Sequence, residues 1–199
     1  MNGGTDGGRS PIKRLRDLRR RQSPVAGLLT DLAVVLVLLL VLRVFFVEGS
    51  YVLSDSMEPT LLPGDWLLTD RLFFRLSGPR HGDIVVFDSP LEPGVEYVKR
   101  LIALPGDELR LEDGRLLIND SPLEEGYLQG APTKDLGFVE GVVPAGYCVT
   151  LGDNRPCSKD SRSWGYLPLS SLTGRVELVY FSYKPGSGAR WGRCATVPP

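Results

Sequence analysis

The chain has 199 residues and a net charge of −1, which allows one soluble domain together with a membrane segment. The charge is unevenly placed. Residues 1–47 carry eight basic and three acidic side chains, a net charge of +5, so the remainder carries −6. Three cysteines are too few for a disulfide framework, and a single histidine excludes a histidine-based metal cluster. We therefore expect no metal ion and no cofactor.

The first segment is a basic arm, residues 1–24, whose first eight residues include four glycines and are expected to be disordered. An apolar run follows at 25–47, interrupted by Asp31 and Arg43. Because about 20 residues of helix cross a bilayer, this run predicts a single transmembrane helix. By the positive-inside rule, the arm lies in the cytoplasm and the chain after residue 47 lies outside the inner or plasma membrane.

Two alternatives exist for this N-terminal region. A basic arm can bind nucleic acid, but its position directly before the apolar run favours a role in topology, and we expect no nucleic-acid partner. A cleaved secretory peptide also begins with basic and then apolar residues. The run at 25–47 is longer than the apolar part of such a peptide, and residues 45–48 offer no small-residue cleavage site. Both observations favour an anchor that is retained.

Beyond residue 47 the sequence shows no long helical periodicity, and short β-rich runs take its place. The pair Asp113-Gly114 between two apolar runs is a strong hairpin signal. We predict a mainly β fold, with an antiparallel sheet domain at 48–199, an insertion at about 106–146 and a loosely held tail after Lys184. The expected strands are 66–71, 83–87, 95–104, 108–111, 115–119, 147–151 and 175–183.

A serine and a lysine after the apolar run suggest a nucleophile and its base. Ser56 needs a base to become a nucleophile, and burial can lower the pKa of a lysine by as much as ~3–5 units. Lys99 lies on an expected strand, where it shares a face with Tyr97 and Leu101, so its neutral amine is favoured. The alternatives are a lysine that extends to water at a sheet edge, and His81 as the base.

Three sequence strings occur in a recognisable order. They are SDSMEPT at 54–60, EYVKR at 96–100 with LPGD after it, and GDNRPCSKDSR at 152–162 with SWG after it. These strings resemble the conserved boxes of type I signal peptidases, which are membrane-bound peptidases with a serine–lysine dyad. Shorter motifs at 64–65 and 82–87 are also similar to that family. With the preceding apolar run, the resemblance covers most of the chain.

The resemblance implies a role for each matched residue. Ser56 would be the nucleophile, Lys99 the general base, and Ser158 a hydroxyl that hydrogen-bonds and orients the lysine. The Ser54 hydroxyl and the Ser56 backbone N–H would form the oxyanion hole. Structural support would come from the charged residues Asp153, Asp160, Arg162 and Arg100. The substrate pocket would be lined by Val52, Leu53, Met57, Leu61, Tyr97 and Val98.

The chain departs from the family pattern at two positions. Leu53 stands where the family usually has a proline, and Cys157 stands where an asparagine often precedes the equivalent of Ser158. Neither change removes a catalytic group. The first bears on the shape of the substrate pocket, and the second places a thiol beside the lysine-orienting serine.

The resemblance implies a serine endopeptidase that removes N-terminal signal peptides from secretory pre-proteins. Its partners would be pre-proteins with small residues before the cut, of the Ala-x-Ala type, and the lipid bilayer. One alternative is a self-cleaving serine–lysine protein of the LexA type, but that class carries a DNA-binding helix-turn-helix where this chain has its apolar run. Another is a non-enzymatic anchored β-domain, which would not need Ser56, Lys99 and Ser158 together.

Overall fold

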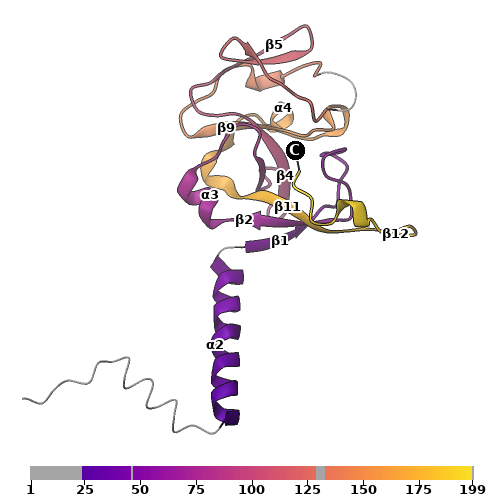
Figure 1. Cartoon of the computed structure of the whole chain (residues 1–199). Coiled ribbons are helices and arrows are strands. Elements are labelled where there is room, and N and C mark those ends of the chain that lie inside the picture. The colour runs from indigo at the N-terminus through magenta and orange to yellow at the C-terminus, as the bar shows by residue number, and fades with distance from the viewer. Residues whose placement is uncertain (1–23, 46, 129–132, 199) are drawn as a thin grey trace, which may run out of the picture. The chain divides into compact units, whose positions relative to one another are not determined.

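The computed structural model describes residues 24–45, 47–128 and 133–198, and the side chains of 40–48, 73 and 138 lie outside that description. The chain divides into two compact units, residues 1–44 and 45–199 (Figure 1). We describe each unit by itself. Most of the expected basic arm lies outside the described residues.

Helix α2, Pro24–Phe45, is the described part of the first unit. Proline suits the first position of a helix, because its missing N–H would have had no intrahelical partner. Ten of its large apolar side chains between Val25 and Leu39 are more than half exposed. In this helix the described side chains end at Leu39. Among the residues whose side chains are described, no helix is long and apolar enough to cross a membrane.

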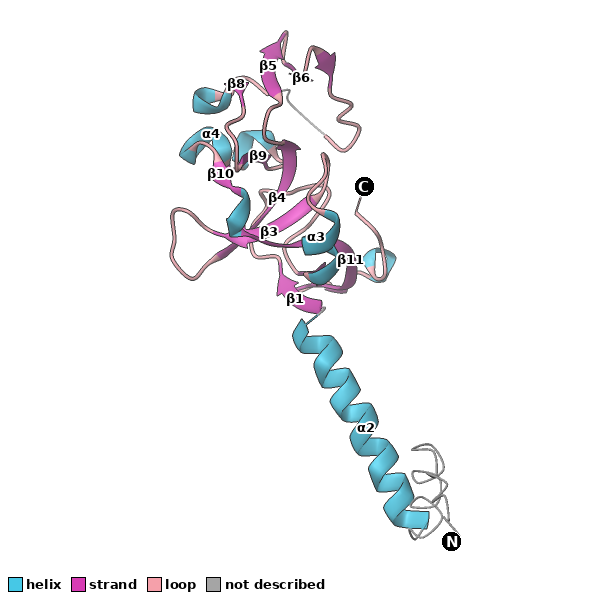
Figure 2. Ribbon diagram, turned by 90° about the vertical axis from the view of Figure 1, so that its left-hand side faces the viewer, coloured by secondary structure: helices cyan, strands magenta, loops and turns pink. Residues whose placement is uncertain are grey.

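The second unit is built on a large antiparallel sheet with strand order β1-β2-β11-β3-β4-β9-β10, and β12 pairs with β11 (Figure 2). The longest strand, β11, pairs with both β2 and β3 and so joins the two halves of the sheet. The bounds are β1 Val47–Tyr51, β2 Asp65–Asp70, β3 Ile84–Asp88, β4 Glu96–Ala103, β9 Tyr147–Leu151, β10 Leu167–Pro168, β11 Leu172–Lys184 and β12 Gly188–Ala189.

A smaller sheet with the order β7-β6-β5-β8 is formed by the chain between β4 and β9. Its hairpin turns at Asp113 and Gly114, both of which have positive φ angles, as a two-residue hairpin turn with this sequence requires. The hairpin expected from the sequence is therefore confirmed. The strands are β5 Glu108–Glu112, β6 Arg115–Ile118, β7 Ser121–Pro122 and β8 Gly141–Val142.

Short helical segments connect the strands of the second unit. The α-helices are α3 Leu72–Ser77 and α4 Ser161–Trp164, and the 3₁₀ turns are η1 Gly137–Val139, η2 Arg155–Cys157, η3 Leu169–Ser171 and η4 Trp191–Arg193. Asp160 caps α4 by accepting the backbone N–H of Arg162. This cap fixes the start of α4 within the last residues of the third sequence string.

Strand β4 lies inside the large sheet, between β3 and β9, and its last five residues, Lys99–Ala103, are buried. Apolar clusters cover both of its faces. One contains Met57, Leu61 and Leu67, and another contains Phe87 and Leu101. A lysine in the middle of β4 is therefore removed from water.

The mainly β, antiparallel fold is confirmed, and each of the seven expected strands corresponds to a strand of the structure within a few residues. The sequence analysis missed β1 and the short helix α3. It was also wrong about the tail, because the side chains of Arg190 and Arg193 both contact the buried Asp65. A buried carboxylate needs such partners, and they hold the tail against the sheet.

Candidate active site

Ser56 and Lys99 come together from separate parts of the chain. Ser56 lies in the turn between β1 and β2, and Lys99 lies on β4. The Ser56 Oγ and Lys99 Nζ are 2.7 Å apart, and the Lys99 Nζ also donates to the Val98 carbonyl at 3.0 Å. Both side chains are buried, Ser56 with 7% and Lys99 with 4% of its surface exposed. The contact between them is short enough for direct proton transfer.

The environment of Lys99 favours its neutral form. Burial lowers the pKa of the Lys99 ammonium from its ordinary value of 10.5 to about 8, although the negative charges of Asp160 and Asp153 oppose the shift. Near pH 8 a large fraction of the amine is therefore unprotonated and able to accept the Ser56 proton. A serine hydroxyl beside a buried amine of lowered pKa is the arrangement that nucleophilic catalysis by serine requires.

Ser54 lies next to the nucleophile, with its Oγ 3.1 Å from the Ser56 Oγ, and its side chain is exposed. Ser158 is placed differently from the expectation. Its Oγ is buried and has no hydrogen-bond partner among the described residues, so no hydrogen bond joins it to Lys99 in this structure. Ser158 and the Ser56 backbone both pack closely against Gly152. A Cβ added at Gly152 would lie 2.1 Å from the Ser158 Oγ and 2.5 Å from the Ser56 carbonyl oxygen, so both residues lie beside this glycine.

Two ion pairs lie near the site, one of them fully buried and the other with a partly exposed arginine. Arg100 donates to both carboxylate oxygens of Asp153, at 2.9 and 2.7 Å. Arg162 donates to both oxygens of Asp160, at 2.8 Å each, and the Gly152 N–H donates to Asp160 at 2.9 Å. The four charged residues that were expected to give structural support thus form two ion pairs, Arg100 with Asp153 and Arg162 with Asp160. Bidentate pairs of this kind fix geometry as well as charge.

An open cavity of about 360 Å³ contains the Ser56 and Lys99 side chains. Five of the six expected pocket residues line it, whereas Leu61 is fully buried in the core beneath and does not. Leu53 is the most exposed of the five, at 82%. The full lining is Tyr51, Val52, Leu53, Ser54, Asp55, Ser56, Met57, Val95, Glu96, Tyr97, Val98, Lys99, Cys157 and Lys159.

A second cavity, of about 450 Å³, lies against the segment between η2 and α4 and against residues 134–137. Ser158 and Arg162 contribute to its lining, but Ser56 and Lys99 do not. The chemistry described above therefore belongs to the smaller cavity.

Sequence reasoning missed several residues that hold the Ser56 turn. The Asn154 N–H donates to the Ser56 carbonyl at 3.0 Å, and the Asn154 side chain donates to the Asp55 carbonyl at 3.1 Å. The Thr60 hydroxyl donates to Asp153 at 2.5 Å. Asn154 and Thr60 both lie within the strings that resemble the family, and this position was the one sign of a role. The strings do not indicate which groups the two side chains bind.

The segment at about 106–146, which the sequence analysis expects to be an insertion, also contributes to the support. The Tyr127 ring lies over the Arg100 guanidinium, with 3.8 Å between the carbon of that group and the ring centroid. Glu125 accepts from the Tyr127 hydroxyl and pairs with Arg155, whose Nε donates to the Gly152 carbonyl. Burial raises the pKa of Tyr127, so its hydroxyl stays protonated as a donor. Residues from this segment thus pack against the ion pair near the site.

The single histidine and the three cysteines are not part of the Ser56–Lys99 contact. The His81 Nε2 lies 2.6 Å from Asp107, and His81 does not line the cavity. The three cysteines are all free. Within the described ranges, no group of three or more histidine, cysteine or acidic side chains could hold a metal ion.

Comparison with known proteins shows the family of the chain. The family profile described as "Signal peptidase, peptidase S26" matches residues 26–181. Signal peptidase I from Leptolyngbya laminosa is 38% identical over 170 residues, which cover 81% of this chain and 82% of the relative. A probable signal peptidase I-1 from Synechocystis is also 38% identical, over 81% of this chain and 83% of its own length.

A solved structure of a signal peptidase I from Enterococcus faecalis is 32% identical to the chain, with a TM-score of 0.42. The match covers 49% of this chain and 96% of that one. Because the family profile matches most of the chain, and because the two curated relatives are 38% identical over 81% of it, this chain belongs to the S26 family of signal peptidases. It is accordingly a serine endopeptidase.

Proposed function

We propose that this protein is a membrane-bound endopeptidase that removes N-terminal signal peptides from secretory pre-proteins, with Ser56 as nucleophile and Lys99 as general base. The observation that carries the proposal is the 2.7 Å contact between the Ser56 Oγ and the buried Lys99 Nζ, two residues that line an open cavity. Family membership supplies the substrate class. It also disfavours the two alternatives raised by the sequence, a LexA-type self-cleaving protein and a non-enzymatic β-domain.

In the proposed reaction, neutral Lys99 takes the Ser56 proton as the Ser56 Oγ attacks the scissile carbonyl. The same proton then passes to the leaving amine, and water releases the acyl-enzyme. The Ser56 N–H and the Ser54 hydroxyl would stabilise the oxyanion, and the loss of one such donor costs about 10²–10³ in rate. The position of the Ser54 Oγ, 3.1 Å from the Ser56 Oγ, supports this assignment.

Ser158 is proposed to orient Lys99 when substrate is bound. Its Oγ is buried beside the site and has no hydrogen-bond partner in the part of the chain that the structure describes, and an unsatisfied buried hydroxyl costs about 1–3 kcal/mol. A hydrogen bond to the Lys99 amine in the complex would remove that cost. It would also fix the direction of the amine lone pair.

The substrate is proposed to carry small residues before the cut, in an Ala-x-Ala arrangement. Apolar side chains of Val52, Met57 and Val98 line the cavity next to Ser56. Met57 has only 1% of its surface exposed and its packing leaves it little freedom to move, so a large side chain at the scissile position would have to displace it.

The anchor is proposed to be the apolar run at 25–47, with the basic arm in the cytoplasm and the peptidase domain at 48–199 outside. Its support is the 22-residue helix α2, which at about 1.5 Å per residue would be about 33 Å long. A helix that exposes apolar residues on all sides suits a lipid environment. The segment at about 106–146, which includes the smaller sheet, is proposed to be an insertion in this domain.

The test is cleavage of a model pre-protein by the purified full chain. We expect cleavage after Ala-x-Ala, and little cleavage when a tryptophan replaces the alanine at the scissile bond. Ser56→Ala and Lys99→Ala should each abolish cleavage, whereas His81→Ala should retain most of it, because His81 is paired with Asp107 outside the cavity. Equal cleavage of both substrates, or full activity in Ser56→Ala, would contradict the proposal.

A further inference from the structure

The C-terminal segment 188–197 packs against the central strand of the large sheet. Strand β12 pairs with the end of β11, η4 follows, and the Val179 N–H donates to the Thr196 carbonyl at 2.8 Å. The family profile ends at residue 181, so this segment lies beyond the part of the chain that it matches. The contacts of the segment are therefore features of this chain that the family match does not describe.

Arg193 joins the C-terminal segment to the end of the Ser56 turn. Its Nη2 donates to Asp65 at 2.5 Å and to the Thr60 carbonyl at 2.8 Å. Arg190 donates to the same Asp65 at 3.2 Å and to the Pro63 carbonyl at 2.6 Å. Asp65 is fully buried, and burial alone would raise its pKa, but hydrogen bonds led by that from Arg193 keep its pKa below the ordinary value. The carboxylate is thus a fixed, charged attachment point.

Thr60 continues this connection to the catalytic base. Its carbonyl is held by Arg193, while its hydroxyl donates to Asp153 at 2.5 Å. Asp153 is in turn bound by Arg100, the residue that follows Lys99. Thr60 lies one turn after Ser56, and the turn is closed by a hydrogen bond from residue 61 to residue 57. One end of the Ser56 turn is thus fixed to the strand that carries the base.

We propose that Arg193 is a positioning residue for the peptidase reaction: it holds the Ser56 turn so that the Ser56 Oγ stays within hydrogen-bond distance of Lys99. The proposal rests on the proposed function, because it takes Ser56 as the nucleophile. Neither Arg193 nor Thr60 lines the substrate cavity. Since a displacement of about 1 Å at a reacting group can cost about 10²-fold in rate, loss of Arg193 should reduce turnover rather than substrate binding.

The experiment compares full-length variants in detergent micelles with a signal-peptide substrate. Arg193→Ala should lower kcat by about ten- to a hundredfold and leave KM within about twofold. Arg193→Lys should give an intermediate kcat, because a lysine keeps the charge beside Asp65 but lacks the planar fork that bonds two acceptors at once. The pH at half-maximal activity should not move in either variant, because the Lys99 pKa is set by burial and by the charges of Asp160 and Asp153, whereas Arg193 contacts Asp65 and Thr60.

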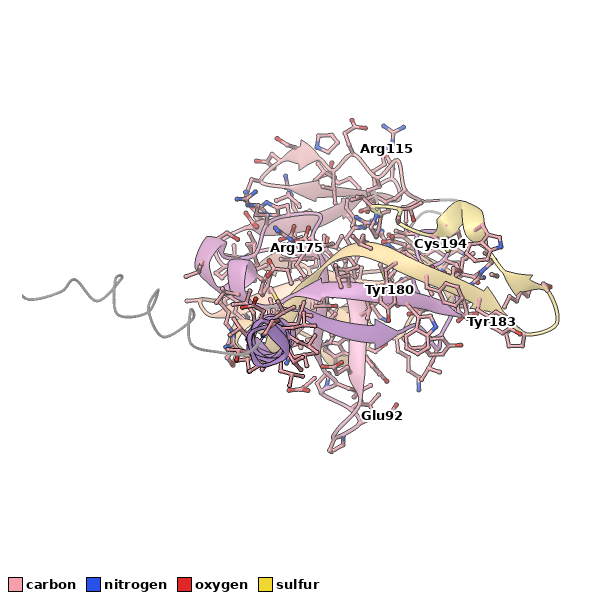
Figure 3. All side chains as sticks on the ribbon, turned by 60° about the horizontal axis from the view of Figure 1, so that its bottom comes forward. Glu92, Arg115, Arg175, Tyr180, Tyr183 and Cys194 are labelled. Atoms are coloured by element: carbon pink, nitrogen blue, oxygen red, sulfur yellow. The ribbon has the colours of Figure 1, made fainter. Side chains whose placement is uncertain are left out.

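Arg175→Ala is the matched control. The Arg175 side chain is exposed to a similar degree as that of Arg193, and it pairs with Glu177 and Asp83. It lies near the first residues of β11, whereas Tyr183 lies near the last residues of this strand and Cys194 lies in the C-terminal segment (Figure 3). Among the described residues its ion pairs are with Glu177 and Asp83, away from the Ser56 turn, so the kcat of Arg175→Ala should stay within about twofold of the parent. A loss of kcat in Arg175→Ala equal to that in Arg193→Ala would overturn the proposal, because the effect would then reflect general destabilisation.

A folded Arg193→Ala variant with the parent kcat would also overturn the proposal. If Arg193→Ala does not fold, the test is made with Arg193→Lys. The parent kcat in Arg193→Lys would then overturn the proposal that the simultaneous contacts of Arg193 with Asp65 and Thr60 position Ser56. Ser56→Ala is assayed alongside. Cleavage that persists in Ser56→Ala would refute the proposed function itself, whatever the Arg193 variants do.

Discussion

At the scale of single residues, the central question is the protonation of Lys99. Burial places its pKa at about 8, below the ordinary 10.5. The reactive form is the neutral amine, so activity should rise with pH and fall about tenfold for each unit below the pKa. We expect kcat/KM to be half-maximal near pH 8, measured with a peptide substrate across pH 6 to 10. A midpoint near the ordinary lysine value would contradict a buried base.

Ser158 supplies a second prediction at this scale, because its hydroxyl has no partner among the residues that the structure describes. If it orients Lys99 in the substrate complex, Ser158→Ala should fold normally and lose kcat with little change in KM, as expected for an interaction made only in the transition state. Steady-state kinetics together with circular dichroism would measure this. Unchanged kcat in the folded variant would leave Ser158 with a packing role alone.

At the scale of elements, the segment after β9 comes into close contact with the Ser56 turn at Gly152. A Cβ at this position would lie 2.5 Å from the Ser56 carbonyl oxygen, which belongs to backbone and cannot rotate away. Gly152→Ala should therefore displace the nucleophile, lowering activity by about 10²-fold and stability by about 1–3 kcal/mol. Cleavage rate and thermal unfolding would measure the two effects.

Gly126→Ala is the control for this prediction. Gly126 has no atom within 4 Å of the added Cβ and no left-handed backbone angle, so the substitution should leave both activity and stability close to those of the parent. Parent activity in Gly152→Ala would mean that the Ser56 turn and the segment after β9 move independently.

At the scale of the whole molecule, the charge distribution of the chain predicts its orientation. The net charge of +5 on residues 1–47 should keep the N-terminus in the cytoplasm and place the peptidase domain outside. Protease added to intact spheroplasts should degrade the domain and spare the arm, and permeabilised cells should lose both. A domain protected in intact spheroplasts would reverse the predicted topology.

The sequence by itself determined the mainly β class of fold and singled out the candidate pair Ser56 and Lys99. Short runs of β-branched and apolar residues between turn clusters indicated the strands, because strand propensity and turn chemistry are local properties of the chain. Asp113-Gly114 specified its hairpin for a similar reason, since both positions need a positive φ angle. Ser56 and Lys99 were found through strings of residues whose order resembles a family.

Only the tertiary structure decided how those residues meet. The burial of Lys99 depends on β4 lying between β3 and β9, and a strand order is not a property of any one segment. The same holds for Leu61, which the fold places in the core instead of the cavity, and for Arg193, which contacts Thr60 from 133 positions away. Hydrogen bonds and desolvation act over a few ångströms in space, so their partners become visible only when the chain is folded.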